Sequence, residues 1–392
     1  MNLRILQTSV QDYINNNQNA DVNKIALAKP IFEAVSSAEL AGQINAKKKS
    51  KHKLPTWYNQ ENIYYPVLLS IEQCSSEQTA SYKAELAIGD NLIDLTAGFG
   101  VDSIFFAKNC QQVYSCEINS ELASISAHNA KILGAQNITV QAENGIDFLQ
   151  NTKILFDTIY IDPARRSESA KVFKLKDCTP DVTAHLDEWL QKAKRIIIKT
   201  APLLDISAGI SELKNVSEIH ILSVKNECKE LLWIIDREPK ATIQLTCATI
   251  NQTTKTITFP ISALQASTKI ATTVPEGFLY EPDVALLKSG AFNYVAEKFN
   301  LQKLHQHSQL YFSDKFDEDF LGRIFEIQEI CSVSELKKKK ELIGNVIVRN
   351  YPEKAENLVK KFKIKPHDSK FILFTKNDNG YLVIFANIKQ HY

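Results

Sequence analysis

The sequence has no long apolar run and no paired cysteines. Its first residues lack the unbroken apolar segment of a secretory signal, and no later stretch approaches the roughly 20 apolar residues that cross a bilayer. The seven cysteines are scattered without a CxxC pair, and no histidine stands near them at metal-ligand spacing. We therefore expect a cytoplasmic protein with no membrane contact and no structural metal. The sequence leaves the oligomeric state open.

An excess of charge of either sign is also missing. The chain holds 46 Lys plus Arg against 45 Asp plus Glu, so an anionic partner would have to meet a local patch. One basic region is residues 322–392, with 14 Lys plus Arg and 8 Asp plus Glu, a net charge of +6. Another is KKKSKHK, from Lys47 to Lys53, which is either a solvated linker or a phosphate-contacting patch.

The pattern of apolar residues divides the 392-residue chain into four parts. The first has apolar residues at three- and four-residue intervals, and the second alternates short strand-like runs with helices. The third contains a hairpin and a helix near Asp283 to Phe299. The fourth reads as β-α-β-α-β-β, with VSELKKKKELI as its first helix. The predicted domains are a helical region at 1–88, an α/β domain at 89–240, a small α+β connector at 241–321 and a small α+β domain at 322–392.

Five short runs in the second part are rich in β-branched residues and too short for helices. The chain between them is long enough for helical crossovers, so they predict a parallel sheet covered on both faces. Two later runs, SEIHILSV and ELLWIID, are close enough to pair as a hairpin at the edge of the sheet. The sequences of the five runs are NLIDLTAG, QVYSCEI, NITVQAE, FDTIYIDP and RIIIKTA.

A glycine-containing loop follows the first of these strands and opens a helix. Glycines there let a ligand approach the backbone closely. Glu117, at the end of the next strand, can accept both ribose hydroxyls of a nucleoside, which favours S-adenosylmethionine as the cofactor. Ser103 stands where a pyrophosphate-binding loop has its last glycine, which disfavours a dinucleotide. The candidate cofactor residues here are Asp94, facing the methionyl ammonium, Thr96, Ala97, Gly98, Gly100, Glu117 and Ile118.

Polar residues also follow the third strand. Asn144, or else Asp147, is placed to contact the adenine amino group, although an ordinary polar turn would look the same. These two residues complete the part of the predicted cofactor site that rests on the sequence pattern.

The fourth strand ends in Asp162-Pro163-Ala164-Arg165-Arg166. The carboxyl ends of parallel strands are where α/β proteins bind ligands. Asp162 and the carbonyls beside Pro163 can hold a methyl-accepting nitrogen, and Asp162 is also a candidate cofactor contact. Arg165 and Arg166 would clamp a phosphate or a guanine edge, unless one of them pairs with a surface carboxylate.

The Asp162 segment resembles the fourth-strand motif of nucleic-acid base methyltransferases, Asp/Asn-Pro-Pro-aromatic, but Ala164 and Arg165 replace its last two residues. It also resembles the turn of the RNA uridine-C5 methyltransferases. Those enzymes attack with a cysteine after the fifth strand, where this chain has Lys199-Thr200-Ala201-Pro202. Covalent pyrimidine chemistry is therefore not expected.

Together, EQCSSEQTA from Glu72, DLTAGFG, IDPARR, the YEPD of 280–283 and the segment from Gly322 resemble a bacterial family of class I methyltransferases. The resemblance implies a Rossmann-like S-adenosylmethionine domain, a small ferredoxin-like insert and a C-terminal THUMP-like domain. It also implies that Gln73 and Ser75 lie near the methionine end of the cofactor. True THUMP domains bind structured RNA, which fits the basic tail.

We therefore expect a methyltransferase of the α/β class that modifies a base nitrogen of tRNA or rRNA. Two alternatives remain at this stage. One keeps the cofactor and gives it a small-molecule or protein acceptor. The other is a non-catalytic RNA-binding protein with a degenerate methyltransferase fold.

Overall fold

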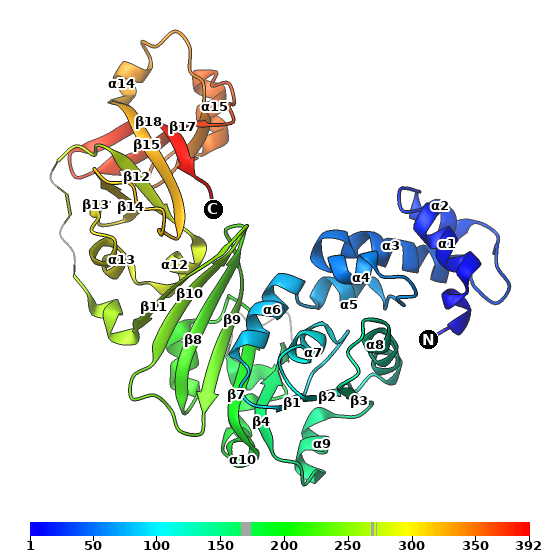
Figure 1. The fold of residues 1–392 in the computed structure, drawn as a ribbon. Coiled ribbons are helices and arrows are strands. Elements are labelled where there is room, and N and C mark those ends of the chain that lie inside the picture. The colour runs from blue at the N-terminus through cyan, green and yellow to red at the C-terminus, as the bar shows by residue number, and fades with distance from the viewer. Residues whose placement is uncertain (166–173, 268–269, 272) are drawn as a thin grey trace. The chain divides into compact units, whose positions relative to one another are not determined.

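The computed structural model describes residues 1–165, 174–267, 270–271 and 273–392 (Figure 1). The chain forms two compact units whose segments alternate in sequence. The first comprises residues 1–217 and 232–241, and the second comprises residues 218–231 and 242–392.

The first 88 residues of the first unit are helical, as the apolar spacing predicts. A short 3-10 helix, η1 (Leu3–Leu6), comes first. The following helices are α1 (Thr8–Asn16), α2 (Val22–Leu27), α3 (Ser37–Lys53), α4 (Pro55–Asn59), α5 (Leu68–Gln73) and α6 (Glu77–Leu86).

The lysine-rich KKKSKHK segment is part of α3, so its interpretation as a linker is wrong. A capping box between Ser36 and Glu39 starts this helix. Lysine is a good helix former, and cations are favoured near a helix C-terminus. Lys47 is buried and donates to the Asn15 side chain at 2.6 Å, while Lys53 donates to carbonyls of α5.

The centre of the first unit is the predicted parallel sheet, with strand order β7-β4-β1-β2-β3. These strands carry the five apolar runs of the sequence: β1 (Asn91–Asp94), β2 (Gln112–Cys116), β3 (Ile138–Gln141), β4 (Phe156–Ile161) and β7 (Ala193–Thr200). The helices between and after them are α7 (Val101–Phe106), α8 (Ser120–Ile132), α9 (Gly145–Asn151), α10 (Leu186–Lys192) and α11 (Ile206–Glu212). A small two-stranded sheet, β5 (Ala164–Arg165) with β6 (Cys178–Thr179), and the 3-10 helices η2 (Leu175–Asp177) and η3 (Val182–Ala184) lie in the same unit.

The N-terminal helices share one apolar core with α7 and α8, and Figure 1 shows them beside these helices. The fully buried Asn129 of α8 exchanges two hydrogen bonds with the backbone of Tyr64, at 2.9 and 3.0 Å. Trp57 of α4 packs on Phe99, with ring centroids 6.2 Å apart. The helical region therefore supports the loop that follows β1.

The chain continues through β8 (Val216–Val224) and β9 (Glu227–Asp236). Lys225 and Asn226 between them both have positive φ angles, as a two-residue hairpin turn requires. The hairpin was expected at the edge of its sheet, but β10 (Gln244–Ile250) pairs in parallel with β8. The antiparallel partner of β10, as predicted, is β11 (Thr254–Pro260), which the 3-10 helix η4 (Ile261–Gln265) follows. The edge position is therefore wrong, because β10 covers the outer side of β8.

The second unit also contains a seven-stranded sheet of order β13-β14-β12-β15-β18-β17-β16. Strand β12 of the predicted connector pairs with β15 of the predicted C-terminal domain, so the two segments share a sheet. The helix expected near Asp283 to Phe299 is two helices, because Gly290 adopts a left-handed conformation between them. The elements are β12 (Phe278–Pro282), α12 (Val284–Ser289), α13 (Phe292–Lys298), β13 (Gln302–His305), β14 (Ser308–Ser313), β15 (Gly322–Cys331), α14 (Val333–Leu336), β16 (Asn345–Val348), α15 (Ala355–Phe362), β17 (Lys370–Asn377) and β18 (Gly380–Gln390).

The β-α-β-α-β-β order of the last segment is as predicted, but its first helix is much shorter than VSELKKKKELI. A capping box between Ser332 and Glu335 starts α14, which ends at Leu336. Four successive lysines follow, and like charges three and four residues apart oppose a continued helix. In the described part of the chain, no helix is long and apolar enough to cross a membrane.

Candidate functional site

The candidate site is built around the loop from Leu95 to Gly100, which follows β1. The backbone N–H of Leu95 donates to Tyr160 in β4 at 3.0 Å, and that of Ala97 donates to Cys116 in β2 at 2.9 Å. The loop is therefore fixed between the carboxyl ends of two neighbouring strands, which is where open α/β sheets bind ligands.

Two glycines give this loop its shape, each for a different reason. Gly98 has a φ of 56° and Gly100 a φ of 80°, both in the left-handed region. A side chain at Gly100 would meet the Ser126 hydroxyl at 2.2 Å, so Gly100 permits close packing of α8. A Cβ at Gly98 would instead enter open space. The room that a ligand needs therefore lies on the Gly98 side of the loop.

Asp94 lies beneath the loop and is fully buried. One carboxylate oxygen accepts from the Thr96 N–H at 3.1 Å, and the other accepts from the Ser103 hydroxyl at 2.6 Å. Burial raises the pKa of Asp94 to about 7, and the hydrogen bond from Ser103 opposes that rise. Both carboxylate oxygens of Asp94 are therefore engaged within the protein, where they fix the loop from below.

Glu117 touches the same loop from the end of β2. Its carboxylate accepts from the Gly98 N–H at 2.9 Å and from the Asn119 N–H at 2.8 Å. A carboxylate has about four acceptor positions, so two remain for other donors. The neighbouring Ile118 is 73% exposed. Glu117 and Ile118 thus offer hydroxyl acceptors and an apolar surface side by side.

The third predicted element lies next to the loop. Gly145 comes so close that an added Cβ would meet the Leu95 carbonyl oxygen at 2.4 Å. Asn144 is the N-cap of α9, and its side chain accepts from the Ile146 N–H at 2.9 Å. Asp147 is exposed in the first turn of that helix. The capping bond matches the polar-turn alternative for Asn144 and still leaves its amide N–H groups available.

Asp162 follows β4 on the other side of the loop. Its backbone N–H donates to the Thr96 hydroxyl at 2.8 Å, and its carboxylate forms an ion pair with Lys199, at the end of β7. The side chain of Asp162 is 36% exposed, so one part of it faces solvent. Pro163 is buried, which fixes the backbone after Asp162. The side chain of Arg165 and the whole of Arg166 lie outside the described residues.

The EQCSSE segment reaches the site through a buried polar cluster that the sequence analysis missed. The Ser75 hydroxyl donates to Asp102 at 2.8 Å and accepts from Lys83 at 2.7 Å. Tyr160 also donates to Asp102, at 2.8 Å. Ser75 is therefore committed to Asp102 and Lys83, whereas Gln73 is exposed at the end of α5.

This cluster places opposite charges beside the loop. Lys83 is fully buried, and its Nζ lies 3.1 Å from Oδ1 of Asp102. Asp102 is in the first turn of α7. Burial raises the pKa of Asp102, but Lys83 and Lys199, with hydrogen bonds from Ser75 and Tyr160, bring it below its ordinary value. The only signal in the sequence was a carboxylate two residues after Gly100. Nothing marked Lys83 in α6 or Lys199 in β7 as its partners.

Comparison with known proteins yields matches along the whole chain. The model of an RNA cap guanine-N2 methyltransferase family matches residues 89–185, a ferredoxin-like domain matches 278–320, and a THUMP domain-like family matches 322–387. A crystal structure of a candidate methyltransferase from Porphyromonas gingivalis W83 has a TM-score of 0.86 and 29% sequence identity. That alignment covers 99% of this chain and 98% of the other.

The chain is therefore similar to class I methyltransferases in its α/β domain, and its second unit is similar to a ferredoxin-like insert and a THUMP-like domain. Two curated relatives also match the chain. An uncharacterized RNA methyltransferase of Mycoplasma mobile is 25% identical over 29% of the chain. An uncharacterized S-adenosylmethionine-dependent methyltransferase of Mycobacterium tuberculosis is 22% identical over 42%. The matches span only 31% and 44% of the lengths of these relatives.

Proposed function

We propose that the protein transfers a methyl group from S-adenosylmethionine to a base nitrogen of tRNA or rRNA. The observation that carries the proposal is the loop before α7, where Glu117 contacts the Gly98 N–H and Gly98 faces open space. A nucleoside cofactor needs this combination of a carboxylate and close access to backbone.

The residues around the loop fit this cofactor. Glu117 keeps two acceptor positions for ribose hydroxyls, and Ile118 offers an exposed apolar surface for the adenine ring. The N–H groups of Thr96, Ala97 and Gly98 are used within the protein, so in this proposal the loop contributes its fixed shape and the open space beside Gly98. In this proposal the N–H groups of the Asn144 amide contact the adenine edge, and Asp147 is the second candidate for that contact.

The methyl acceptor lies against Asp162 in this proposal. S-adenosylmethionine supplies an already activated methyl group, so the protein chiefly has to position the attacking nitrogen. Asp162 accepts a hydrogen bond from the acceptor's N–H and stabilises the positive charge that develops on that nitrogen. Lys199 holds one oxygen of Asp162, and the Thr96 hydroxyl holds its backbone. Both contacts therefore orient the carboxylate.

Two findings support RNA as the acceptor. The family model that matches residues 89–185 describes an RNA cap guanine-N2 methyltransferase, which modifies a base nitrogen. The relative from Mycoplasma mobile is named an RNA methyltransferase. Arg165 and Arg166 remain candidates for the phosphate or guanine edge of the same substrate.

The direct test is transfer of a labelled methyl group from S-adenosylmethionine to bulk RNA from cells that lack the gene. We expect label in one modified purine nucleoside of tRNA or rRNA. The Asp162→Ala variant should lose at least about 100-fold in turnover, because it removes the acceptor used in the transition state. Its affinity for S-adenosylhomocysteine should stay within about threefold of the wild type.

The matched variant is Glu117→Ala, which should weaken S-adenosylhomocysteine binding by about tenfold or more, since a carboxylate that accepts hydroxyl hydrogen bonds is lost. Its melting temperature should change little. Equal loss of binding and of turnover in both variants would contradict the division of roles between Glu117 and Asp162. Label in protein or in small molecules, with none in RNA, would contradict the proposed acceptor.

A further inference from the structure

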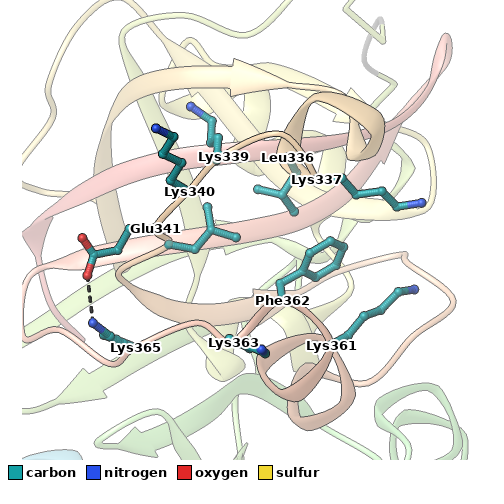
Figure 2. A pocket seen from close by; sticks show the side chains of 10 residues that line it. Leu336, Lys337, Lys339, Lys340, Glu341, Lys361, Phe362, Lys363 and Lys365 are labelled. Atoms are coloured by element: carbon teal, nitrogen blue, oxygen red, sulfur yellow. Dashed lines mark hydrogen bonds and ion pairs between the residues drawn. The ribbon is translucent and has the colours of Figure 1, made fainter.

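The second unit has a hollow of about 770 Å³ that is lined chiefly by lysines. Its two walls are the segment that follows α14 and the segment at the end of α15 (Figure 2). We call it the lysine groove. Its lining residues are Leu336, Lys337, Lys339, Lys340, Glu341, Leu342, Lys361, Phe362, Lys363 and Lys365.

The groove carries six lysines and one glutamate, although the whole chain has a net charge of +1. Three of the lysines are paired with carboxylates: Lys339 with Glu329, Lys361 with Glu353 and Lys365 with Glu341. The other three, Lys337, Lys340 and Lys363, are exposed and have no carboxylate partner among the residues that the structure describes. Gathering these charges in one hollow costs repulsion that a bound anion would relieve.

The backbone around Lys363 adds a second observation. Lys363 ends α15 in a left-handed conformation with a φ of 53°, where glycine is the usual residue. The carbonyls at this helix end already accept from backbone N–H groups, those of Lys363 and Ile364. The lysine is therefore not needed to satisfy them, and its side chain extends the positive lining of the groove.

Apolar side chains form the interior of the groove. Leu336 and Leu342 are buried, and Phe362 is half-buried. Figure 2 shows Phe362 between Lys337 and Lys361, which extend on the same side of it. The Lys361 ammonium lies 5.6 Å from the Phe362 ring centroid. The Phe362 ring also stacks on Phe374, with centroids 6.0 Å apart, so only its exposed part, between the ammonium groups, is open to a base.

We propose that the lysine groove binds a single-stranded stretch of RNA, with Lys337, Lys340 and Lys363 on its phosphates and Phe362 against a base. The inference rests on the proposed function, because it assumes that the methyl acceptor is RNA. A lipid surface would require protruding apolar side chains, whereas the leucines here are recessed below the lysines.

The test uses the full-length chain and a labelled single-stranded RNA, with binding measured by fluorescence anisotropy from about 50 to 300 mM salt. The groove variant is Lys337→Gln/Lys340→Gln/Lys363→Gln. The control variant, Lys298→Gln/Lys354→Gln/Lys370→Gln, removes the same charge from exposed lysines of the same unit that do not line the groove. S-adenosylhomocysteine binding is measured in parallel.

We expect the groove variant to bind RNA at least tenfold more weakly at low salt. The slope of log K against log salt should fall by about two, since each single-strand phosphate contact contributes about 0.7. The control should stay within about threefold of the wild type, and both variants should keep the wild-type affinity for S-adenosylhomocysteine. Phe362→Leu should also weaken binding but leave the salt slope unchanged.

Equal RNA affinities for the groove and control variants would overturn the inference. Binding of the wild type to anionic phospholipid vesicles that the groove variant loses, with RNA binding intact, would overturn it in favour of a membrane surface. The outcome for the proposed function is separate. A wild type that binds RNA through the groove but methylates no RNA would count against the proposed acceptor and support the groove.

Discussion

At the scale of single residues, the site depends on two carboxylates that hold the same loop. Asp94 accepts from the N–H of Thr96, and Glu117 accepts from that of Gly98. The two differ in environment, because Asp94 is fully buried and Glu117 is partly exposed. Asp94 is therefore suited to fixing the loop, and Glu117 to meeting a ligand.

The burial of Asp94 predicts a pH dependence of stability. Its pKa is about 7 in the folded protein, against an ordinary value of 3.8. Between about pH 4 and pH 7 the folded state keeps a proton that the unfolded state releases, so stability falls as pH rises and then levels off. Urea unfolding should show this loss in the wild type and not in Asp94→Asn.

A second variant checks the cause of this effect. The Ser103 hydroxyl donates to Asp94 and lowers its pKa. In Ser103→Ala, the loss of stability with rising pH should therefore continue to a higher pH than in the wild type. Parallel unfolding curves for the wild type and Asp94→Asn from pH 4 to 8 would show that Asp94 is not protonated in the folded state.

Several residues of the site could be predicted from the sequence, and others could not. Glycines and carboxylates at strand ends leave a pattern, so Gly98, Glu117 and Asp162 were found and lie around one loop. Lys83 and Lys199 are 116 residues apart in the sequence, and their roles depend on burial and on ion pairs formed in the folded protein. No local pattern distinguishes them from surface lysines.

At the scale of elements, the buried cluster joins α6 to the first turn of α7. Lys83, Asp102 and Ser75 link these helices directly beside the cofactor loop. Removing one partner of a buried ion pair leaves an uncompensated charge, which costs far more than the pair itself contributes. We therefore expect the free energy of unfolding to fall strongly when Lys83 or Asp102 is replaced alone and only weakly when both are replaced.

We predict that Lys83→Met lowers the free energy of unfolding by about 3–5 kcal/mol in urea denaturation. Lys83→Met/Asp102→Asn should recover most of that loss, because neither charge then remains in the interior. Lys48→Met, at an exposed position of α3, serves as the control and should change stability by less than about 0.5 kcal/mol. Additive losses in the double variant would mean that Lys83 and Asp102 do not act as a pair.

The order of helices and strands followed from the sequence because β-branched runs and three- to four-residue spacing reflect burial directly. The ends of helices that contain runs of lysine were harder to predict. The lysines of KKKSKHK continue α3, whereas the lysines after Leu336 end α14. The difference is tertiary, since Lys47 and Lys53 reach acceptors on other elements. The four lysines from 337 to 340 have only Lys339 in an ion pair among the described residues.

At the scale of the whole molecule, each unit carries one of the two proposed binding sites. The loop and its carboxylates belong to the first unit, and the lysine groove belongs to the second. Each unit is built from separate stretches of the chain, because residues 218–231 belong with 242–392. The predicted domains were continuous stretches of sequence. The composition of residues 218–231 does not show that they belong with residues 242–392.

In the proposed function, the loop before α7 binds S-adenosylmethionine on its open side. Gly98 and Gly134 both have positive φ and open space at the Cβ position, but only Gly98 lies in that loop. Alanine at either position costs about 1–2 kcal/mol of backbone strain. A comparison of the two variants therefore separates the blocked ligand site from the strained backbone.

The decisive measurement is a calorimetric titration of S-adenosylhomocysteine into the wild type, Gly98→Ala and Gly134→Ala. We expect micromolar binding to the wild type, an unchanged affinity in Gly134→Ala and at least about a tenfold loss in Gly98→Ala, a difference of about 1.4 kcal/mol. No binding to the wild type at about 1 mM ligand, or equal losses in the two variants, would contradict this proposal.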